Sequence, residues 1–272
     1  MMGNASVVVV RDLVVKYGGR TILDHINLDI RRGEVLVLLG GSGSGKSTLL
    51  RHLIGLEKPQ SGSIIVKGVD INQCSEAELT QVRRSIGVSF QNAALFGSMT
   101  VSENVAFPLL ERTRLVDSTI EEVVLLKLAQ VGLVHFGAFY PSQLSGGMLK
   151  RASVARATAL DPEILFFDEP SAGLDPITAA GIDELVVYMK NALQMTVLVV
   201  THELQSAFKI ADRLAFLRDQ KLVAIGPTDS IAQSTDPWVR QFLDRLPDRT
   251  SDDKTELLQQ LAERLGVQCP KN

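Results

Sequence analysis

Residues 34–48 read EVLVLLGGSGSGKST, an apolar segment that runs directly into a glycine-rich loop. The loop, Gly40 to Thr48, has the spacing G-x-x-x-x-G-K-[ST], in which backbone N–H groups close around phosphate oxygens. The segment before it predicts a buried strand over 34–39, and the residues after it predict a helix from about Lys46 to Leu56. A strand before the loop and a helix after it favour a nucleotide site over a flexible glycine linker.

The residues of this loop have distinct expected roles. Lys46 brings a mobile positive charge to the β and γ phosphates, and the Ser47 hydroxyl can ligate Mg²⁺. The predicted nucleotide-binding residues of the loop are Gly40, Gly41, Ser42, Gly43, Ser44, Gly45, Lys46, Ser47 and Thr48.

Polar residues also follow three other short apolar runs, each of which predicts a buried strand. These are Gln91 after IGVSF (86–90), Asp168 and Glu169 after ILFF (164–167), and His202 shortly after TVLVV (196–200). A further run, LAFL, covers 214–217. Helical patterns lie between these runs, so the alternation predicts a mostly parallel sheet. Ligands bind at the carboxyl ends of such strands, so we expect these polar residues to share one crevice with the glycine loop.

Two adjacent carboxylates at the end of one strand suggest hydrolysis rather than binding alone. Asp168 is expected to hold Mg²⁺ through water, and Glu169 to polarise the attacking water as a general base. The alternative, in which Glu169 only forms a surface salt bridge, is disfavoured by the surrounding motifs. Gln91 is expected to contact the metal and the water, and His202 to sense the γ-phosphate.

A second glycine pair occurs in LSGGM, residues 144–148. Ser145 precedes Gly146 and Gly147, and helix-forming residues follow, so we expect an exposed helix N-terminus that can hold an anion. A phosphate already held by Lys46 does not need this second cradle within the same chain. A symmetric dimer, in which LSGGM of one chain faces the ATP of the other, accounts for both motifs.

The bulk composition limits the classes of protein that fit. The 272 residues carry a formal charge of −3, with 45% hydrophobic and 22% charged residues. This balance describes a globular chain and argues against a nucleic-acid partner. Cys74 and Cys269 lack metal-ligand spacing, which favours a reducing compartment. No apolar run approaches the ~20 residues that span a bilayer, and the N-terminus lacks the pattern of a signal peptide, so we expect a soluble chain.

The remaining segments predict how the chain is divided. Residues 6–33 predict short strands around the Gly18-Gly19 turn, and Tyr17 before this turn is a candidate to stack on adenine. Residues 92–160 contain helical patterns and predict a helical subdomain inserted into an ATPase domain that covers 6–235. Two capping boxes are predicted, one from Ser75 with Glu78 and the other from Ser118 with Glu121.

Residues 236–272 predict a C-terminal helical extension. Asp236-Pro237 can start a helix whose apolar face is formed by Trp238, Val239, Phe242, Leu243 and Leu246. After a polar break, Ser251 can cap a last amphipathic helix with the stripe Leu257, Leu258, Leu261 and Leu265. This helix either folds back on its own domain or docks on a second subunit.

The order of GGSGSGKST, Gln91, LSGGM, FFDEP, AGLDP and His202 resembles that in the ATPase subunits of ABC transporters, over nearly all of 6–235. The resemblance implies an α/β P-loop fold with a mostly parallel sheet core, an antiparallel β-subdomain and an inserted helical subdomain. It also implies ATP and Mg²⁺ as ligands, Asp175 of AGLDP as a link between the two sites of a dimer, and a membrane permease whose coupling helices dock beside Gln91. Met148 departs from the family, because most members have glutamine there.

A closer similarity lies in LSGGM, LFGSMTVSENVAFPL and VRQFLDRL, which are similar to the ATPases of the maintenance-of-lipid-asymmetry (Mla) systems. This resemblance implies phospholipid movement between the two membranes of Gram-negative bacteria, at the cytoplasmic face of the inner membrane. It implies as partners a permease dimer, a periplasmic ring of MCE-domain protein and a small STAS-domain protein on the helical subdomain. The alternatives are an ABC ATPase for another solute and, less favoured, a soluble ABC protein of DNA repair or translation.

Overall fold

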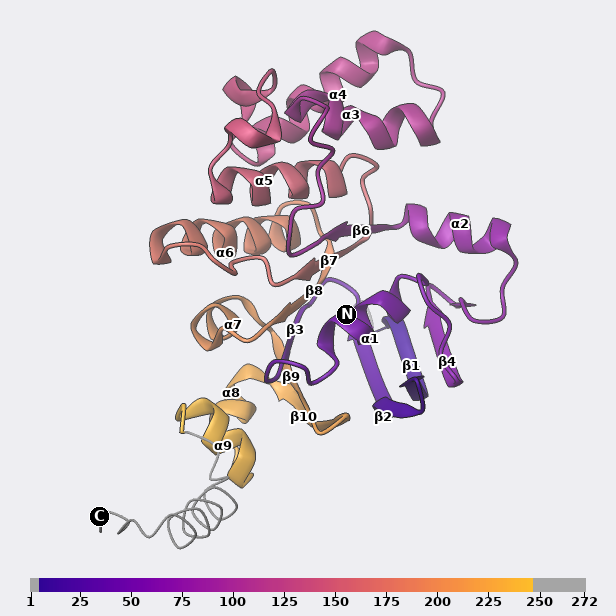
Figure 1. The fold of residues 1–272 in the computed structure, drawn as a ribbon, viewed down its shortest axis with the longest axis vertical. Helices are drawn as coiled ribbons and strands as arrows, with labels where there is room; N and C mark the ends of the chain where they lie inside the picture. Colours follow the sequence, from indigo (N-terminus) through magenta and orange to yellow (C-terminus); the bar gives the residue numbers. More distant parts are fainter. Residues whose placement is uncertain (1–4, 247–272) are drawn as a thin grey trace, which may run out of the picture. The chain divides into compact units, whose positions relative to one another are not determined.

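The computed structural model describes residues 5–246, so the stretch with Ser251 and the leucine stripe predicted for the last helix lies outside the described residues. The chain divides into two compact units, Met1–Ile231 and Ala232–Asn272. The first unit contains a six-stranded sheet, a four-stranded sheet and a set of helices (Figure 1).

The six-stranded sheet has the order β10-β9-β3-β8-β7-β6. Its five parallel strands are the five that the apolar runs predict, so this part of the prediction is confirmed. They are β3 (Val35–Leu39), β6 (Ile86–Ser89), β7 (Ile164–Asp168), β8 (Thr196–Thr201) and β9 (Arg213–Arg218). Every residue of β3 and β8 is buried, which explains why these segments are continuous apolar runs rather than alternating ones.

The antiparallel sheet has the order β2-β1-β4-β5 and packs with α1 (Lys46–Leu53) over one face of the parallel sheet. The strands β1 (Ser6–Tyr17) and β2 (Arg20–Arg31) have 12 residues each, so the prediction of short strands is wrong. Register shifts along the β1–β2 ladder accommodate the left-handed residues Asp12 (φ 51°) and His25 (φ 53°) without ending the pairing.

Three strands were missing from the sequence-based prediction. They are β4 (Ser61–Val66), β5 (Val69–Asp70) and β10 (Lys221–Pro227). None of them forms a continuous buried run: β5 has two residues, and β10 alternates between exposed and half-buried positions. Their pairing partners, rather than their own hydrophobicity, establish them as strands.

Local end signals decide where several helices begin and end. The helix α1 (Lys46–Leu53) ends three residues before the predicted Leu56, because Gly55 adopts a left-handed φ of 68°. The helix α2 (Glu76–Arg84) begins with the predicted capping box, in which Ser75 and Glu78 bond each other's backbone. This capping box is therefore confirmed.

The second predicted capping box is wrong. The helix α4 (Asp117–Gln130) begins directly after Val116, so Ser118 already lies in the first turn and cannot act as its cap. A capping box that the sequence analysis did not identify joins Thr100 and Glu103 at the start of α3 (Val101–Arg112).

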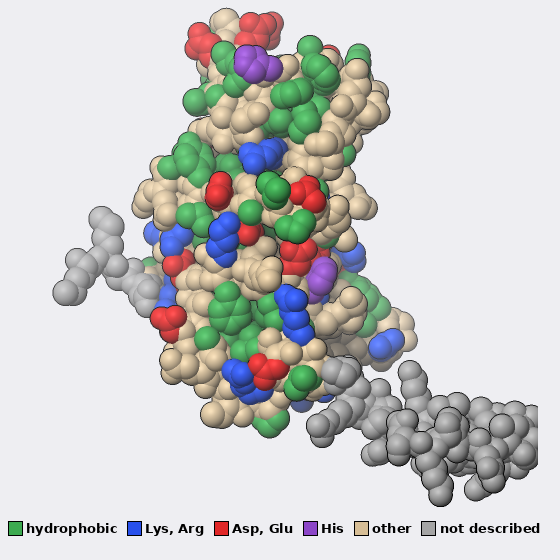
Figure 2. Space-filling view, turned by 90° about the vertical axis from the view of Figure 1, so that its left-hand side faces the viewer, with side chains coloured by type: hydrophobic (Ala, Val, Ile, Leu, Met, Phe, Trp, Pro, Cys, Tyr) green, Lys and Arg blue, Asp and Glu red, His purple; other side chains and the backbone are tan. Residues whose placement is uncertain are grey.

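The helical part between β6 and β7 consists of α3, α4, α5 (Gly146–Ala157) and two short 3-10 segments, Val134–Phe136 and Pro141–Gln143. It lies beyond the β6 and β7 end of the sheet (Figure 1). Hydrophobic side chains gather on its surface in the upper part of Figure 2. The large exposed ones are Leu110, Leu115, Val116, Leu125, Leu126, Val134, Phe139 and Tyr140.

The later helices are α6 (Pro176–Asn191), α7 (Leu204–Ile210), α8 (Thr228–Ala232) and α9 (Pro237–Leu243). The start of α9 is confirmed: Asp236 accepts bonds from the N–H groups of Trp238 and Val239, and Pro237 occupies the first turn. Within residues 5–246, no helix combines the length and the apolarity needed to cross a bilayer.

Candidate active site

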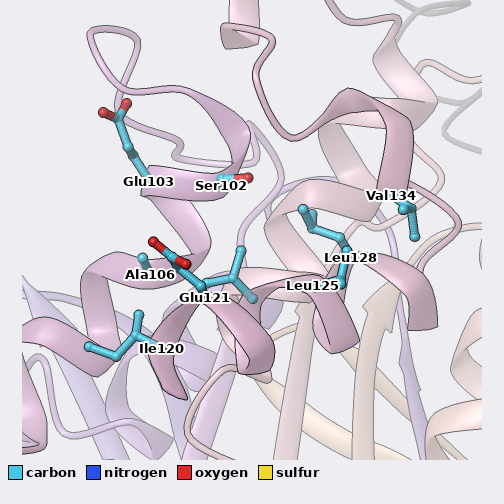
Figure 3. A pocket seen from close by; sticks show the side chains of 9 residues that line it. Ser102, Glu103, Ala106, Ile120, Glu121, Leu125, Leu128 and Val134 are labelled. Carbon is cyan, nitrogen blue, oxygen red and sulfur yellow. The ribbon is translucent and has the colours of Figure 1, made fainter. Parts of the chain in front are cut away.

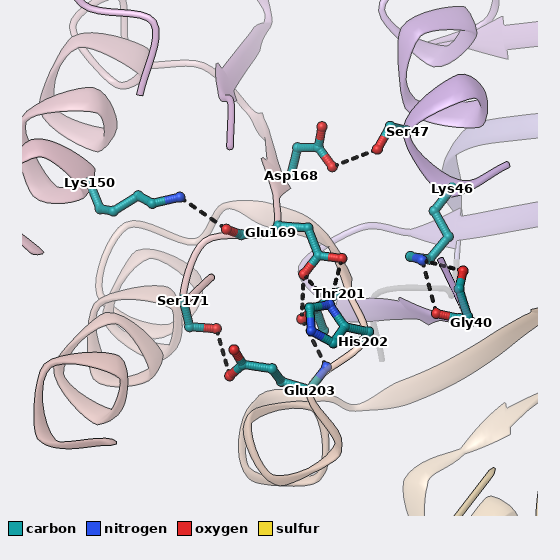
Figure 4. A network of polar contacts seen from close by, with 11 residues as sticks. Gly40, Lys46, Ser47, Lys150, Asp168, Glu169, Ser171, Thr201, His202 and Glu203 are labelled. Carbon is teal, nitrogen blue, oxygen red and sulfur yellow. Dashed lines mark hydrogen bonds and ion pairs between the residues drawn. The ribbon is translucent and has the colours of Figure 1, made fainter. Parts of the chain in front are cut away.

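The strand register brings the predicted site residues to one edge of the parallel sheet. At this edge Leu39 of β3 pairs with Thr201 of β8, and Asp168 of β7 pairs with Val200. The glycine loop, Glu169 and His202 therefore leave neighbouring strands at the same level. Figure 4 shows Lys46, Asp168, Glu169 and His202 together in one network of polar contacts.

The glycine loop is shaped to receive an anion. Gly45 is the N-cap of α1 with a φ of 104°, and no side chain caps the first-turn N–H groups, which leaves them free for phosphate oxygens. A Cβ atom at Gly40 would lie 2.4 Å from the carbonyl oxygen of Leu217, so only glycine fits there. Among the described residues, the buried hydroxyl of Ser44 has no hydrogen-bond partner, as expected of a group that awaits a ligand.

The Lys46 ammonium lies across the mouth of this loop. Its side chain is buried, and Nζ donates to the carbonyl oxygens of Gly40 (2.9 Å) and Gly41 (3.0 Å). Burial lowers the pKa of Lys46, while the charges of Glu169 and Asp168 act in the opposite direction. Phosphate oxygens would be stronger acceptors for this ammonium than two neutral carbonyls.

Ser47 in the first turn of α1 and Asp168 at the end of β7 provide a pair of oxygen atoms. The Ser47 hydroxyl donates to Asp168 Oδ1 at 3.0 Å. Burial raises the pKa of the Asp168 carboxyl, the hydrogen bond from Ser47 lowers it, and Glu169 raises it further. A hydroxyl and a partly desolvated carboxylate are the hard oxygen ligands that Mg²⁺ takes, so these residues fit the metal. The Gln91 side chain is exposed, and its contact within the site is made by its backbone carbonyl with Lys150.

Glu169 is held by residues of β8 and the loop that follows it. Its Oε2 accepts a bond from the Thr201 hydroxyl at 3.1 Å, and both of its carboxylate oxygens lie 3.0 Å from Nδ1 of His202. Its φ is +48°, a left-handed conformation that is uncommon for glutamate and that turns the chain sharply after β7. The carboxylate is therefore fixed in one orientation at the open edge of the sheet.

The sequence analysis did not identify Thr201, which is the last residue of β8 and which no local spacing links to Glu169. The sequence analysis also did not identify Ser171 and Glu203, which are joined by a hydrogen bond of 3.0 Å beside the site. Thr201 also accepts a bond from the backbone N–H of Glu203. These contacts extend the support of Glu169 to the start of α7.

The second glycine pair forms the start of α5, as its sequence predicts. Ser145 is the N-cap and accepts a bond from the N–H of Met148 at 3.3 Å. A Cβ atom at Gly147 would lie 2.3 Å from Cγ2 of Thr178, so close packing against α6 requires glycine. Among residues 5–246, no hydrogen bond joins Ser145–Met148 to the loop Gly40–Thr48 of the same chain.

Asp175 caps α6 beside this packing contact. It accepts bonds of 3.1 Å from the N–H groups of Ile177 and Thr178, and the Thr178 hydroxyl donates to it at 2.5 Å. These bonds, with the hydroxyl first, hold the pKa of Asp175 below its ordinary value. The AGLDP and LSGGM segments therefore both contact Thr178: Asp175 accepts a hydrogen bond from its hydroxyl, and Gly147 packs against its methyl group.

Tyr17 lies apart from these groups, at the end of β1. Its ring is substantially exposed, and its hydroxyl donates to a carboxylate oxygen of Glu57. Burial and this hydrogen bond raise its pKa.

A phosphate loop after β3, an Asp-Glu pair after β7, a histidine after β8 and an inserted helical part define a P-loop nucleoside triphosphatase. The ABC transporter family matches residues 23–172, which is more than half of the chain. The chain therefore belongs to the ABC transporter family, as an ATP-binding subunit with ATPase activity.

The chain is also similar to individual relatives. It is 42% identical to the intermembrane phospholipid transport system ATP-binding protein MlaF of Haemophilus influenzae, over 88% of this chain and 91% of that protein. It is 44% identical to the probable ribonucleotide transport ATP-binding protein mkl of Mycobacterium leprae, over 86% of this chain and 67% of that protein. The match thus spans about two thirds of the mycobacterial relative. Among solved structures, the dimeric ATP-binding cassette MJ0796 bound to ADP and Pi has a TM-score of 0.75 and 32% identity, over 81% of this chain and 98% of that one.

Proposed function

We propose that the chain is the ATP-hydrolysing motor of a membrane complex that moves phospholipids between the inner and outer membranes and so maintains outer-membrane lipid asymmetry. Similarity to MlaF over 91% of that protein's length supports this substrate class. The alternative is transport of another solute. The name of the mycobacterial relative, ribonucleotide transport, favours it, but the match covers a smaller share of that protein.

The observation that carries the hydrolytic part is the Glu169 carboxylate, fixed 3.0 Å from His202 Nδ1 beside the metal-ligand pair of Asp168 and Ser47. In this proposal Glu169 polarises the attacking water, and His202 senses the γ-phosphate and orients the base. Tyr17 stacks on the adenine, and Lys46 with the amides of the glycine loop holds the phosphates.

Ser47 and Asp168, together with the Gln91 side chain, are the residues that would hold Mg²⁺. The ion supplies positive charge that neutralises the phosphate oxygens when ATP is bound. The Ser47 and Asp168 side-chain oxygens are 3.0 Å apart, whereas Gln91 is exposed and contacts Lys150 through its backbone carbonyl.

We further propose that two copies of the chain sandwich two ATP molecules. The start of α5, with Ser145, Gly146 and Gly147, then faces the γ-phosphate held by the other copy, and Asp175 links the two sites. The separation of the two phosphate cradles within one chain supports this arrangement, and so does the dimeric state of the MJ0796 cassette. Residues 6–235 form the ATPase domain in this proposal, with the helical subdomain at about 92–160, and α9 begins the C-terminal extension predicted for 236–272, of which residues 247–272 lie outside the described residues.

The proposed partners follow from the Mla resemblance. A permease docks beside Gln91 and holds the chain at the cytoplasmic face of the inner membrane, and an MCE-domain protein completes the complex. A small STAS-domain protein binds the helical part, where a groove of about 310 Å³ opens between α3 and α4 (Figure 3). The groove has an apolar floor that includes Ile120, Val124 and Leu128, and Glu103 and Glu121 are also among its lining residues.

The test is mass spectrometry of the proteins that co-purify with the tagged chain from mild-detergent extracts of its native membranes. We expect a permease, an MCE-domain protein and a small STAS-domain protein. A different permease together with a soluble solute-binding protein would favour the other-solute alternative. Recovery without any membrane protein would contradict the transport function.

A further inference from the structure

The helix α5 carries a row of polar side chains that bonds the last residue of β6 and the loop after it. Lys150, Ser153 and Arg156 are spaced three residues apart, so they share one face of the helix. Their partners lie in the segment 89–94. Lys150 Nζ donates to the carbonyl of Gln91 at 2.5 Å, Ser153 Oγ accepts from Ser89 Oγ at 3.1 Å, and Arg156 donates to the carbonyls of Ala93 at 3.2 Å and Ala94 at 2.7 Å.

The bonded loop is in a conformation that it would not hold unaided. Ala93 and Ala94 are consecutive and have φ values of 58° and 52°, in the left-handed region that alanine rarely occupies. Such backbone persists only where the surroundings hold it in place. The row of side chains on α5 supplies that restraint.

Lys150 differs from the other two members of the row because its ammonium also reaches Glu169. Nζ donates to the Glu169 carbonyl oxygen at 3.0 Å (Figure 4). On the other side of the same residue, the Glu169 N–H donates to the carbonyl of Val200 in β8 at 2.8 Å. The left-handed backbone of Glu169 is thus held from one side by β8 and from the other by Lys150.

The environment of Lys150 indicates a specific role for its charge. The residue is only 7% exposed, and burial lowers its pKa while the carboxylates of Asp168 and Glu169 act to raise it. Its ammonium is paired with two backbone carbonyls rather than with a carboxylate side chain. Removing the ammonium would take one donor from both carbonyls at once.

We propose that Lys150 is a positioning residue for ATP hydrolysis, which fixes the backbone of Glu169 and ties it to the Gln91 loop and to the helix that begins with LSGGM. Lys150 itself does not touch the nucleotide in this scheme. When a docked protein displaces the Gln91 loop, the Lys150 ammonium transmits this displacement to the backbone of Glu169. The inference rests on the proposed role of Glu169 as the base.

The test compares K150M and K150R in the whole purified chain, with kcat, KM, the affinity for a fluorescent ATP analogue and the melting temperature measured for each. For K150M we expect kcat to fall about tenfold to a hundredfold while nucleotide affinity stays unchanged, because a misplaced base affects the chemical step. For K150R we expect an intermediate kcat, since the guanidinium can still donate to the two carbonyls.

The matched control is K127M in α4. Lys127 is another buried lysine, only 2% exposed and paired with Asp161, away from the site. We expect K127M to lower the melting temperature without the same loss of kcat. Equal losses of kcat in K127M and K150M would overturn the proposal, and so would a wild-type kcat in folded K150M.

A double mutant separates this proposal from the role of Glu169. If Lys150 acts through Glu169, then K150M causes no further loss of kcat in an E169Q background, because the base is already absent. A full additional loss in that background would overturn the positioning role. A wild-type rate in E169Q by itself would instead contradict the proposed base.

Discussion

Nδ1 of His202 lies 3.0 Å from both carboxylate oxygens of Glu169, and the two side chains differ sharply in exposure. The His202 side chain is 57% exposed, whereas that of Glu169 is 12% exposed. The imidazole therefore bridges a nearly buried carboxylate and the open edge of the sheet. The same ring can orient the proposed base and meet a phosphate that enters from outside.

Replacing Glu169 with glutamine tests the base. E169Q keeps the size of the side chain and an oxygen for Thr201, but it cannot take a proton from water. We expect the turnover rate to fall by about 10²- to 10⁴-fold while ATP binding is retained and a nucleotide-bound dimer accumulates. Turnover assays and size-exclusion with ATP measure both effects. The control is E163Q at a surface ion pair, which is expected to hydrolyse ATP normally.

Replacing Lys46 with alanine tests the phosphate loop. The ammonium now bonds two loop carbonyls, and its removal takes away the charge that would meet the β and γ phosphates. We expect K46A to bind ATP more weakly and to lose transport activity, as measured by nucleotide titration and by lipid movement in the reconstituted complex. The exposed Lys58 gives a matched control, K58A. An ATP affinity equal to wild type in K46A would contradict this reading of the loop.

A methyl group at Gly147 tests the packing between LSGGM and AGLDP. Its Cβ would lie 2.3 Å from Cγ2 of Thr178, which is too close without movement of α5 or α6. We expect G147A to destabilise the fold by about 1–3 kcal/mol, measured by denaturant unfolding. Adding T178S removes the clashing methyl group and keeps the hydroxyl, so G147A/T178S should recover most of the loss. If G147A/T178S recovered no stability, the loss in G147A would not arise from the contact with the Thr178 methyl group.

The carboxyl of Asp175 gives a prediction about pH. The Thr178 hydroxyl, with two backbone N–H groups, holds the pKa of Asp175 below its ordinary value. A depressed folded-state pKa adds stability above the unfolded-state pKa, and this stability is lost as the pH falls through the folded-state value. We expect T178V to raise the pKa of Asp175 in an NMR titration and to reduce the stability that is lost as the pH falls. T178S is expected to leave the pKa and the pH dependence of stability unchanged. An unchanged pKa in T178V would rule out the hydroxyl as the main cause.

Much of the fold could be predicted because its signals are local. The segments VLVLL (35–39) and VLVV (197–200) are apolar throughout, since both faces of those strands are covered. The strands β4, β5 and β10 could not be predicted, because their pairing with neighbours defines them and their own hydrophobic patterns are weak. The failed capping box at Ser118 has a similar cause: the Ser-x-x-Glu spacing was present, but the helix begins at Asp117, two residues too early for Ser118 to be its N-cap.

The candidate site divides in the same way. The glycine loop, the Asp168-Glu169 pair and the LSGGM motif could be recognised because each places its chemistry within a few consecutive residues. The support of Glu169 could not be recognised, because Thr201 lies 32 residues from it along the chain. Neither a period nor a spacing in the sequence indicates such a pair.

The sequence by itself determined the phosphate loop, the order of the motifs and the family. These features depend on residues that are neighbours along the chain, namely the glycines that shape the loop and the apolar runs that form buried strands. Only the tertiary structure decided that Lys150 bonds both Gln91 and Glu169, and that Gly147 needs the space beside Thr178. The physical reason is that these contacts form when helices pack on the sheet edge. Packing brings together groups whose separation along the chain carries no local signal.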